Sequence, residues 1–452
     1  AEDDAEDDAE DDAEDDAEDD AEDDAEDDAE DDAEDDAEDD AEDDAEDDAE
    51  DDAEDDGEDR VDDDDLPALE ASLESLIDDV FDVAFDASGD VIARNELLLL
   101  VDNDDLSILD QLSHWQQIER ESLPRFDSTL IRLGVPSGKE MESALLAVRD
   151  LVPNASIDYN HGYEITRSDQ TRSSSSEGRA AAMEYQHSEI LLSPDLRIGL
   201  IDSGVSTSHE ALKRGSIQSR SFLDNARRTE KQHGTAVASL LIGQSEQITG
   251  MAPNAKLFAA EAFFNDPQLG LVSTGFKLVR ALEWLAQNEV HVVNMSLTGP
   301  DNAVLERALE FVSEEDIIIV AAAGNEGPAA PPLYPAAYPN VLAVTAIDEQ
   351  ARPFLRAVRG PHLDFAAPGV RLTVADGAKA SGYRRATGTS FATPLITALV
   401  LHYQGTRPAM DRSDLLEIMR EDAIDLGPAG HDSIFGWGLA GSSLLANPRT
   451  QQ

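Results

Sequence analysis

The sequence predicts an α/β protein in which a small α+β unit (residues 91–163) precedes a doubly wound, mostly parallel sheet (residues 190–445). Three nearly continuous apolar runs are expected to be parallel strands buried on both faces: 198–201, 290–294 and 317–321. Two segments that alternate with these runs carry apolar residues at helical spacing: 273–287 and 303–314. Such a domain binds its ligands at the carboxyl ends of the strands.

Residues 1–66 are predicted to be a disordered acidic tail. Residues 1–56 repeat Ala-Glu-Asp-Asp fourteen times, and a helix there would set like charges against each other at i,i+4. The tail holds 48 of the 100 acidic residues of a chain whose net charge is −68, which argues against nucleic acid or an anionic membrane as a partner. A second interpretation is a low-affinity calcium collector, although the repeat lacks the glycine and the ligand spacing of an EF-hand loop.

After a linker over residues 67–90, the unit at 91–163 has the pattern β-α-β-β-α-β, which is typical of a ferredoxin-like fold. A short helix at 105–113 is expected to be capped by Asp104 or Asp105. The helix after Ser137 carries four apolar residues on one face: Met141, Ala144, Leu145 and Val148. The segments expected to be strands are 96–101, 126–133 and 155–159.

Residues 164–189 are rich in Ser, Arg, Gly and Ala and predict an exposed linker, a place where proteolytic nicking concentrates. Residues 446–452 are expected to be a short C-terminal tail. The chain contains no cysteine and no apolar stretch of transmembrane length. Because it begins with alanine rather than methionine, we expect that a targeting segment has been removed and that the protein is secreted or periplasmic.

Ser390 stands where a Gly-Thr turn opens into a long apolar helix, so its hydroxyl is held at a helix N-terminus. A serine is a weak nucleophile unless a base takes its proton. Asp202 directly follows the strand at 198–201, and His233 opens another apolar helix, so the chain offers a carboxylate and an imidazole. Eight other histidines have no comparable setting: His114, His161, His187, His209, His291, His362, His402 and His431.

Asn325 follows the strand at 317–321 within Ala-Gly-Asn-Glu-Gly. Its amide can donate a hydrogen bond to an oxyanion, and the small neighbours let a substrate backbone approach. Taken alone, the segment is equally typical of a turn.

Together these motifs resemble the subtilisin family of serine proteases. The chain order Asp202, His233, Ser390 is the order of that family. Four further motifs match it: Gly-Met-Ala-Pro at 250–253, Val-Asn-Met-Ser-Leu at 293–297, Tyr-Pro-Ala at 334–336 and Phe-Ala-Ala-Pro-Gly at 365–369.

The resemblance implies that Ser390 attacks the peptide carbonyl, that His233 acts as general base and then acid, and that Asp202 holds His233. Asn325 and the backbone N–H of Ser390 would bind the oxyanion. The segment that would pair with the substrate and line the pocket for the residue before the scissile bond (P1) comprises Ser296, Leu297, Thr298 and Gly299, with Ala323, Gly324 and Leu333.

Three departures from the family pattern stand out. Thr298 replaces a frequent glycine, and Leu333 falls where many relatives keep a small residue. Both indicate a narrower P1 pocket, although apolar packing of the wall is an equal alternative. Residues 242–250 lack the Asn-rich loop of the family's strong calcium site. We therefore predict no metal ligands and no cofactor for the chemistry, and the sequence does not support a structural calcium.

The resemblance also implies that residues 91–163 are a propeptide that blocks the cleft as an intramolecular inhibitor. The expected protein is then a monomeric, self-processing serine endopeptidase that acts on protein or peptide substrates. Two other interpretations remain: a catalytically silent relative that binds without cutting, and an acidic, cation-binding surface protein in which the protease domain is incidental. The presence of all four predicted catalytic residues argues against the first, and calcium titration of residues 1–66 would test the second.

Overall fold

The computed structural model describes residues 82–165, 195–224, 229–407 and 410–444. The predicted acidic tail, most of both predicted linkers and the C-terminal residues 446–452 lie outside these ranges. None of the described helices is long and apolar enough to cross a membrane.

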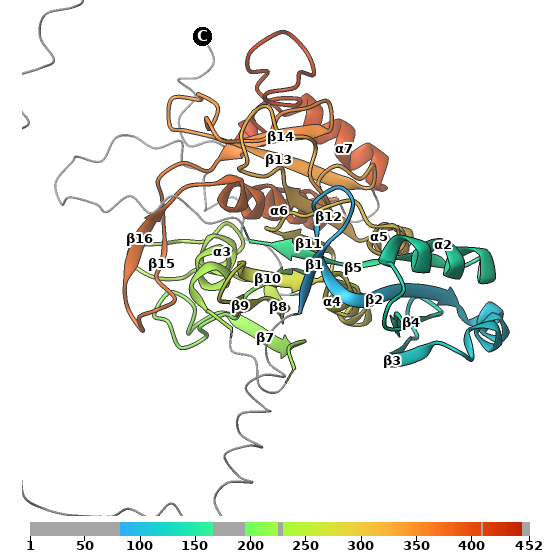
Figure 1. Ribbon diagram of the computed structural model, residues 1–452. Coiled ribbons are helices and arrows are strands. Elements are labelled where there is room, and N and C mark those ends of the chain that lie inside the picture. The colour runs from blue at the N-terminus through green and yellow to red at the C-terminus, as the bar shows by residue number, and fades with distance from the viewer. Residues whose placement is uncertain (1–81, 166–194, 225–228, 408–409, 445–452) are drawn as a thin grey trace, which may run out of the picture. The chain divides into compact units, whose positions relative to one another are not determined.

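The predicted parallel sheet is present (Figure 1). Its strand order is β14-β13-β12-β11-β6-β8-β7, and every neighbouring pair is parallel. The strands are β6 (Arg197–Asp202), β7 (Ser216–Ser221), β8 (Lys256–Glu261), β11 (Val292–Met295), β12 (Ile318–Ala322), β13 (Val341–Ile347) and β14 (Leu363–Pro368).

Successive side chains of the central strands enter two different cores. Val292 and Ile318 pack with the residues of α3 (Gln232–Ile242) and α6 (Thr389–Thr406). Their neighbours Val293 and Ile319 pack with those of α4 (Gly275–Gln287) and α5 (Ala303–Glu314). The sheet is therefore buried on both faces, which explains the near-continuous apolar runs. Shorter elements complete the domain: α7 (Arg412–Glu421), η2 (Ser442–Leu444), and the antiparallel pair β15 (Leu372–Ala375) and β16 (Tyr383–Ala386).

The N-terminal unit has the predicted order of elements and its own apolar core. Its antiparallel strands lie in the order β3-β4-β2-β5. Its elements are β2 (Val91–Asp102), the 3-10 helix η1 (Asn103–Leu112), β3 (Gln116–Leu123), β4 (Ser128–Gly134), α2 (Met141–Leu151) and β5 (Ser156–Glu164).

Several boundaries differ from the prediction. The predicted cap of the first helix is wrong: Asp102 holds the N-cap position without a side-chain hydrogen bond to the helix, while Asp104 and Asp105 lie in its first turn. The helix expected from residue 273 begins at Gly275, because the two preceding residues belong to β10 (Gly270–Thr274). Several strands lie where the sequence analysis named none, among them β9 (Phe264–Asp266) and β1 (Val83–Phe85), the latter within the predicted linker.

Asp364 of β14 predicts a pH dependence of stability. Burial raises the pKa of this carboxyl from 3.8 to about 6, although its Oδ2 accepts a hydrogen bond from the Ala343 amide at 2.9 Å and Arg412 and Arg420 oppose the shift. A carboxyl whose pKa is raised by folding stabilises the protein while protonated, and that contribution is lost as the pH rises through about 6.

Asp364→Asn, which keeps the hydrogen-bond acceptor, should therefore raise the free energy of unfolding at pH 8 by roughly 2 kcal/mol more than at pH 4. Thermal melts at both pH values, in a Ser390→Ala background to prevent self-cleavage, measure the difference. An equal effect of the substitution at the two pH values would contradict the raised pKa.

Candidate active site

The predicted catalytic residues gather at the carboxyl edge of the parallel sheet. Asp202 is the last residue of β6, Ser296 directly follows β11, and Asn325 follows β12. Because these strands are parallel neighbours in the order β12-β11-β6, their ends meet at one edge. The site is therefore built from residues that span 123 positions of the chain, from Asp202 to Asn325.

Asp202 and His233 form a buried hydrogen-bonded pair. The Nδ1 atom of His233 lies 2.9 Å from Oδ1 and 3.0 Å from Oδ2 of Asp202. Asp202 has no exposed surface, and its Oδ1 also accepts the backbone N–H of Ser203 at 2.7 Å. A carboxylate at Nδ1 places the ring proton there, so that Nε2 carries the lone pair.

A close backbone approach supports this pair. The Gly234 amide donates to the Ser203 hydroxyl at 3.0 Å, and a Cβ atom at Gly234 would lie 2.5 Å from the Ser203 carbonyl oxygen. Only glycine lets α3 approach the end of β6 this closely. Local sequence carries no separate signal for Ser203, which lies between Asp202 and a glycine in an ordinary turn motif.

Ser390 lies in the first turn of α6, as predicted. Its hydroxyl is 3.4 Å from the Ser296 carbonyl oxygen, and the Ser296 hydroxyl donates to the Ser390 carbonyl at 2.9 Å. The imidazole of His233 packs beside Phe391, the residue after Ser390, with ring centroids 5.4 Å apart. Among the residues that the structure describes, the buried Nε2 of His233 finds no hydrogen-bond partner. The Nε2 atom of His233 is thus an unengaged acceptor on a ring that packs against Phe391, directly after Ser390.

Asn325 is oriented by Thr389, the residue before Ser390. Its Oδ1 accepts the Thr389 backbone N–H at 3.0 Å and the Thr389 hydroxyl at 3.1 Å. The carbonyl end of the amide is therefore engaged, which leaves the Nδ2 donors available. Gly388, at φ 153°, lies against this amide: a Cβ atom there would lie 3.2 Å from Nδ2. Thr389 is a site residue that the sequence analysis missed.

The predicted substrate-binding segment already pairs with other strands. Thr298 exchanges two backbone hydrogen bonds with Glu164, at 2.8 and 3.0 Å. Gly299 exchanges two with Tyr334, at 2.8 and 3.0 Å. Ser296 and Leu297 are buried beside them. The end of the N-terminal unit therefore occupies one edge of this segment.

The residues predicted to line the P1 pocket lie together. Ala323 is buried, and Gly324 has φ 108°, a conformation that favours glycine. A Cβ atom at Gly324 would lie 2.7 Å from Cδ1 of Leu333 and 2.5 Å from Oε2 of Glu326. Leu333 is thus placed against the Gly324 backbone, and a narrower P1 pocket stays a prediction. Glu326 joins the wall without having been singled out from the sequence.

Two histidines that the sequence left unassigned are buried and partnered. His161 Nδ1 lies 2.8 Å from Nδ2 of Asn302, and its Nε2 lies 3.5 Å from the Asp86 carboxylate. His209 Nε2 lies 2.9 Å from the Gly382 carbonyl oxygen. These partners come from distant parts of the chain, so local sequence could not identify them.

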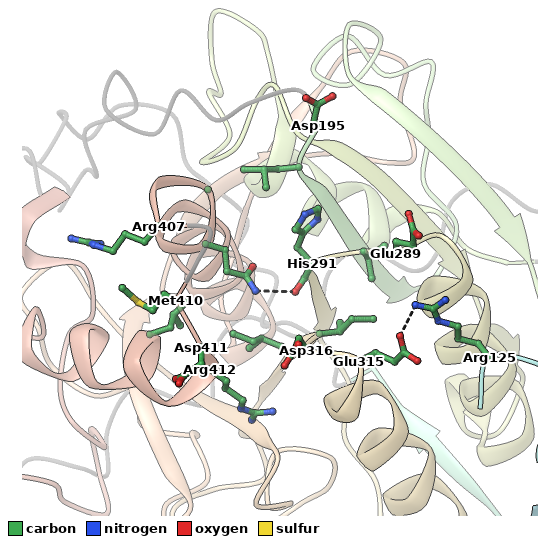
Figure 2. Close-up of a pocket in the computed structure, with 17 residues that line it drawn as sticks. Arg125, Asp195, Glu289, His291, Glu315, Asp316, Arg407, Met410, Asp411 and Arg412 are labelled. Carbon is green, nitrogen blue, oxygen red and sulfur yellow. Dashed lines mark hydrogen bonds and ion pairs between the residues drawn. The ribbon is translucent and has the colours of Figure 1, made fainter. Parts of the chain in front are cut away.

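A cavity of about 660 Å³ lies at the other end of the strands (Figure 2). Leu196, before β6, and His291, before β11, line it together with residues from the end of α6 and the start of α7. Arg125 pairs with Glu315 at one side of it, and the Gln404 amide donates to the His291 carbonyl at 3.3 Å. None of the predicted catalytic residues lines this cavity. Among the described residues, no group of three or more His, Cys, Asp or Glu side chains could hold a metal ion.

Comparisons with known proteins assign the chain to a family. The model of the subtilase family matches residues 193–438. The minor extracellular protease Epr of Bacillus subtilis (strain 168) is 33% identical over 252 residues, which are 55% of this chain and 38% of that protein. M-protease of Shouchella clausii (strain KSM-K16) is 30% identical over 344 residues, or 75% of this chain and 84% of that protein.

A likeness to a solved structure extends over most of the chain. Fervidolysin from Fervidobacterium pennivorans, described as a keratinolytic enzyme related to subtilisin, has a TM-score of 0.63 at 18% identity, covering 78% of this chain and 61% of that one. At this identity the likeness shows the fold alone. The residues matched by the family model include the whole Asp202, His233, Asn325 and Ser390 constellation. The chain belongs to the subtilase family of serine proteases, with residues 83–165 preceding its catalytic domain.

Proposed function

We propose that this chain is a self-processing serine endopeptidase that uses Asp202, His233 and Ser390 as its catalytic triad. The observation that carries the proposal is the buried Asp202–His233 pair, whose Nε2 is unengaged beside the turn that carries Ser390. The large majority of buried polar side-chain atoms in proteins have a hydrogen-bond partner, so an unengaged Nε2 on a paired histidine points to a function.

In the proposed reaction, His233 Nε2 takes the proton of the Ser390 hydroxyl as that oxygen attacks the peptide carbonyl. Asp202 accepts the hydrogen bond from Nδ1 and stabilises the imidazolium that forms. His233 then gives its proton to the leaving amine, and water repeats the sequence on the acyl-enzyme. The hydroxyl must turn from the Ser296 carbonyl to Nε2 when substrate binds, an adjustment typical of free active sites.

The oxyanion formed in this step would be bound by the Asn325 amide and the backbone N–H of Ser390. Thr389 donates two hydrogen bonds to the Asn325 carbonyl oxygen and so orients the Nδ2 donor before the reaction begins. No reorganisation energy is then needed to bind the oxyanion. The position of Ser390 in the first turn of α6 adds the positive end of the helix dipole. No cofactor is needed for these steps.

We assign residues 91–163 to a ferredoxin-like prodomain, supported by the antiparallel order β3-β4-β2-β5. Its last strand pairs with β10 and, through Glu164, with Thr298, so it lies along the proposed substrate segment. Asp158 of the same strand accepts the Ala303 amide at 2.9 Å and so satisfies a free amide in the first turn of α5. Glu283 of α4 accepts the Arg125 amide at 2.9 Å. These contacts support an intramolecular inhibitor that is cut from the catalytic domain within residues 164–189.

The proposal also covers the setting of the enzyme. Extended backbone pairing at Thr298 and Gly299 suits protein and peptide substrates of many sequences, and the strong negative charge disfavours nucleic acid. Secretion is supported by the extracellular relative. A monomer with its own prodomain as the inhibitor is the simplest assembly of these parts.

Intact mass before and after incubation with a fluorophosphonate probe tests the function. The full chain should lose its segment up to a cut within residues 164–189 and gain one probe, and peptide mapping should place the probe on Ser390. Adding a trace of active protease distinguishes a blocked zymogen from a silent relative. A chain that gains no probe even after this treatment would refute the proposal.

A further inference from the structure

The carbonyl group of Ser390 lacks its ordinary helical donor. Ser390 lies in the first turn of α6, and the residue four positions later in the same helix is Pro394. A proline has no backbone N–H to donate, and its ring crowds the carbonyl group four residues before it. Because Ser390 is buried, another part of the protein has to supply the missing hydrogen bond.

Ser296, directly after β11, supplies that hydrogen bond. Its hydroxyl donates to the Ser390 carbonyl oxygen at 2.9 Å. Its own carbonyl oxygen lies 3.4 Å from the Ser390 hydroxyl. Ser296 thus contacts Ser390 at both of that residue's oxygen atoms. A shift of Ser296 is therefore passed on to the hydroxyl that attacks the substrate.

Two further side chains extend this contact into the core. The Nδ2 group of Asn294 donates to the Ser296 hydroxyl at 2.9 Å, and the Thr397 hydroxyl donates to Oδ1 of Asn294 at 3.0 Å. Asn294 lies on the same face of β11 as Val292, the face that packs against α6. Neither Asn294 nor Thr397 has exposed surface. We call the three hydrogen bonds from Thr397 through Asn294 and Ser296 to the Ser390 carbonyl the Thr397 relay.

The two ends of the Thr397 relay fix the direction of its hydrogen bonds. The single hydroxyl proton of Thr397 has two acceptors at 3.0 Å, namely Oδ1 of Asn294 and the Thr393 carbonyl oxygen. The Thr393 carbonyl lies inside α6, where the helix backbone already supplies a donor. If the Asn294 amide turned over, it would accept from Ser296, and the buried Ser390 carbonyl would lose its donor. Since an unpaired buried carbonyl is costly, the relay points toward Ser390.

The relay holds one side of the proposed nucleophile while Asn325 holds the other. Oδ1 of Asn325 accepts the backbone N–H of Thr389, the residue before Ser390, at 3.0 Å. The relay holds the carbonyl that follows the Ser390 side chain. In an enzyme, a misplacement of the reacting atom by about 1 Å can cost on the order of a hundredfold in rate. The rate should therefore depend on buried groups that never touch the substrate.

We infer that Asn294 and Thr397 are positioning residues, which act through Ser296 to set the place of the Ser390 hydroxyl. The inference rests on the proposed function, because it assumes that Ser390 is the nucleophile. It goes further in assigning a role in the reaction to two buried side chains that lie outside the triad and the oxyanion site.

Thr397→Val and Thr397→Ser test the inference. Valine keeps the branched shape of threonine without the hydroxyl, whereas serine keeps the hydroxyl. Each variant is the full chain, incubated with a trace of wild-type enzyme until its mass is constant. Thr397→Val should lower both kcat on a quenched peptide and the rate of fluorophosphonate labelling about tenfold, the size of one lost hydrogen bond. KM should stay within about twofold, as expected when only the chemical step is affected. Thr397→Ser should stay close to the wild type in both rates.

The extent and the rate of labelling separate positioning from stability. Loss of a residue that only stabilises the fold would lower the final fraction of labelled chains, and the competent chains would react at the wild-type rate. Thr397→Val should instead reach full labelling slowly. The pH at which the labelling rate is half-maximal should not move, because the Asp202–His233 pair is untouched.

Thr406→Val is the matched control. Like Thr397, Thr406 belongs to α6 and has a hydroxyl that donates to the carbonyl four residues earlier, at 2.9 Å from His402. This control removes the same kind of hydrogen bond within the helix and leaves the relay intact. Its labelling rate should equal that of the wild type.

A double-mutant cycle with Ser296→Ala shows whether Thr397 acts through Ser296. The Asn294 amide separates the two hydroxyls, so the effects of two independent losses would multiply. In the Ser296→Ala chain the relay has already lost its last step. Thr397→Val should therefore slow labelling there by less than about twofold. Thr397→Ala takes the place of the valine variant if circular dichroism shows that variant to be unfolded.

The outcomes are distinguishable. A wild-type labelling rate in Thr397→Val would overturn the inference, and so would a serine variant as slow as the valine variant. Equal slowing by Thr397→Val with and without the Ser296 hydroxyl would overturn the path through Ser296. In all these cases the protease function stands. If the wild-type chain is neither labelled nor active, the proposed function fails and the inference fails with it.

Discussion

Ser390→Ala is expected to abolish peptide hydrolysis, with a loss of about 10⁶ in kcat; this figure is subtilisin's own and is carried over through family membership. The physical reason is that His233 and Asp202 act on the substrate only through the serine oxygen. Without that oxygen, the unengaged Nε2 of His233 has no proton to accept. Initial rates on a quenched peptide, normalised to protein concentration, measure the loss.

The substitution should leave the fold unchanged, because the Ser390 hydroxyl makes only a long contact of 3.4 Å with the Ser296 carbonyl. Far-UV circular dichroism and the melting temperature check this. Ser245→Ala is a matched control that should keep full activity. Ser245 is a loop serine whose hydroxyl accepts hydrogen bonds from the Ile248 amide and the Tyr383 hydroxyl. Hydrolysis by Ser390→Ala at even a hundredth of the wild-type rate would mean that the nucleophile lies elsewhere.

The sequence predicted the parts of the fold that depend on local pattern. Strand β12 lies where the apolar run predicted it, because all of its residues are buried. Helix α5 lies where helical spacing predicted it, because its buried residues recur every three or four positions. The sequence analysis assigned no residues to strand β3. Its sequence, Gln-Gln-Ile-Glu-Arg-Glu-Ser-Leu, is mostly exposed and therefore has little apolar signal. Its place comes from pairing with β4, a contact between separate segments of the chain.

The candidate site was predictable to the same extent. Asp202, His233, Asn325 and Ser390 stand in compact motifs, each at a strand end or helix start, and the structure places them there. The pairing of Glu164 with Thr298 could not be derived from local pattern, because it joins residues 134 positions apart through backbone groups that carry no sequence information. The same holds for Asp158 at the start of α5.

Asp202→Asn is expected to lower kcat by about 10⁴ while leaving the structure in place. Both carboxylate oxygens lie within 3.0 Å of His233 Nδ1 and accept the hydrogen bond that its N–H group donates. An asparagine of the same shape can turn its NH₂ group toward the imidazole, since the Ser203 amide favours keeping the oxygen on its own side. The histidine proton then resides on Nε2, where it cannot act as a base toward Ser390.

The matched control is Asp364→Asn, the same chemical change at a carboxyl of β14 whose oxygen accepts the Ala343 amide. It should alter stability with pH but not kcat, whereas Asp202→Asn should alter kcat with little change in KM. A loss of activity of similar size in both variants would indicate a general structural effect. A fall in kcat confined to Asp202→Asn, with fluorophosphonate labelling of Ser390 slowed in parallel, would support a carboxylate that acts by holding the proton of His233 on Nδ1.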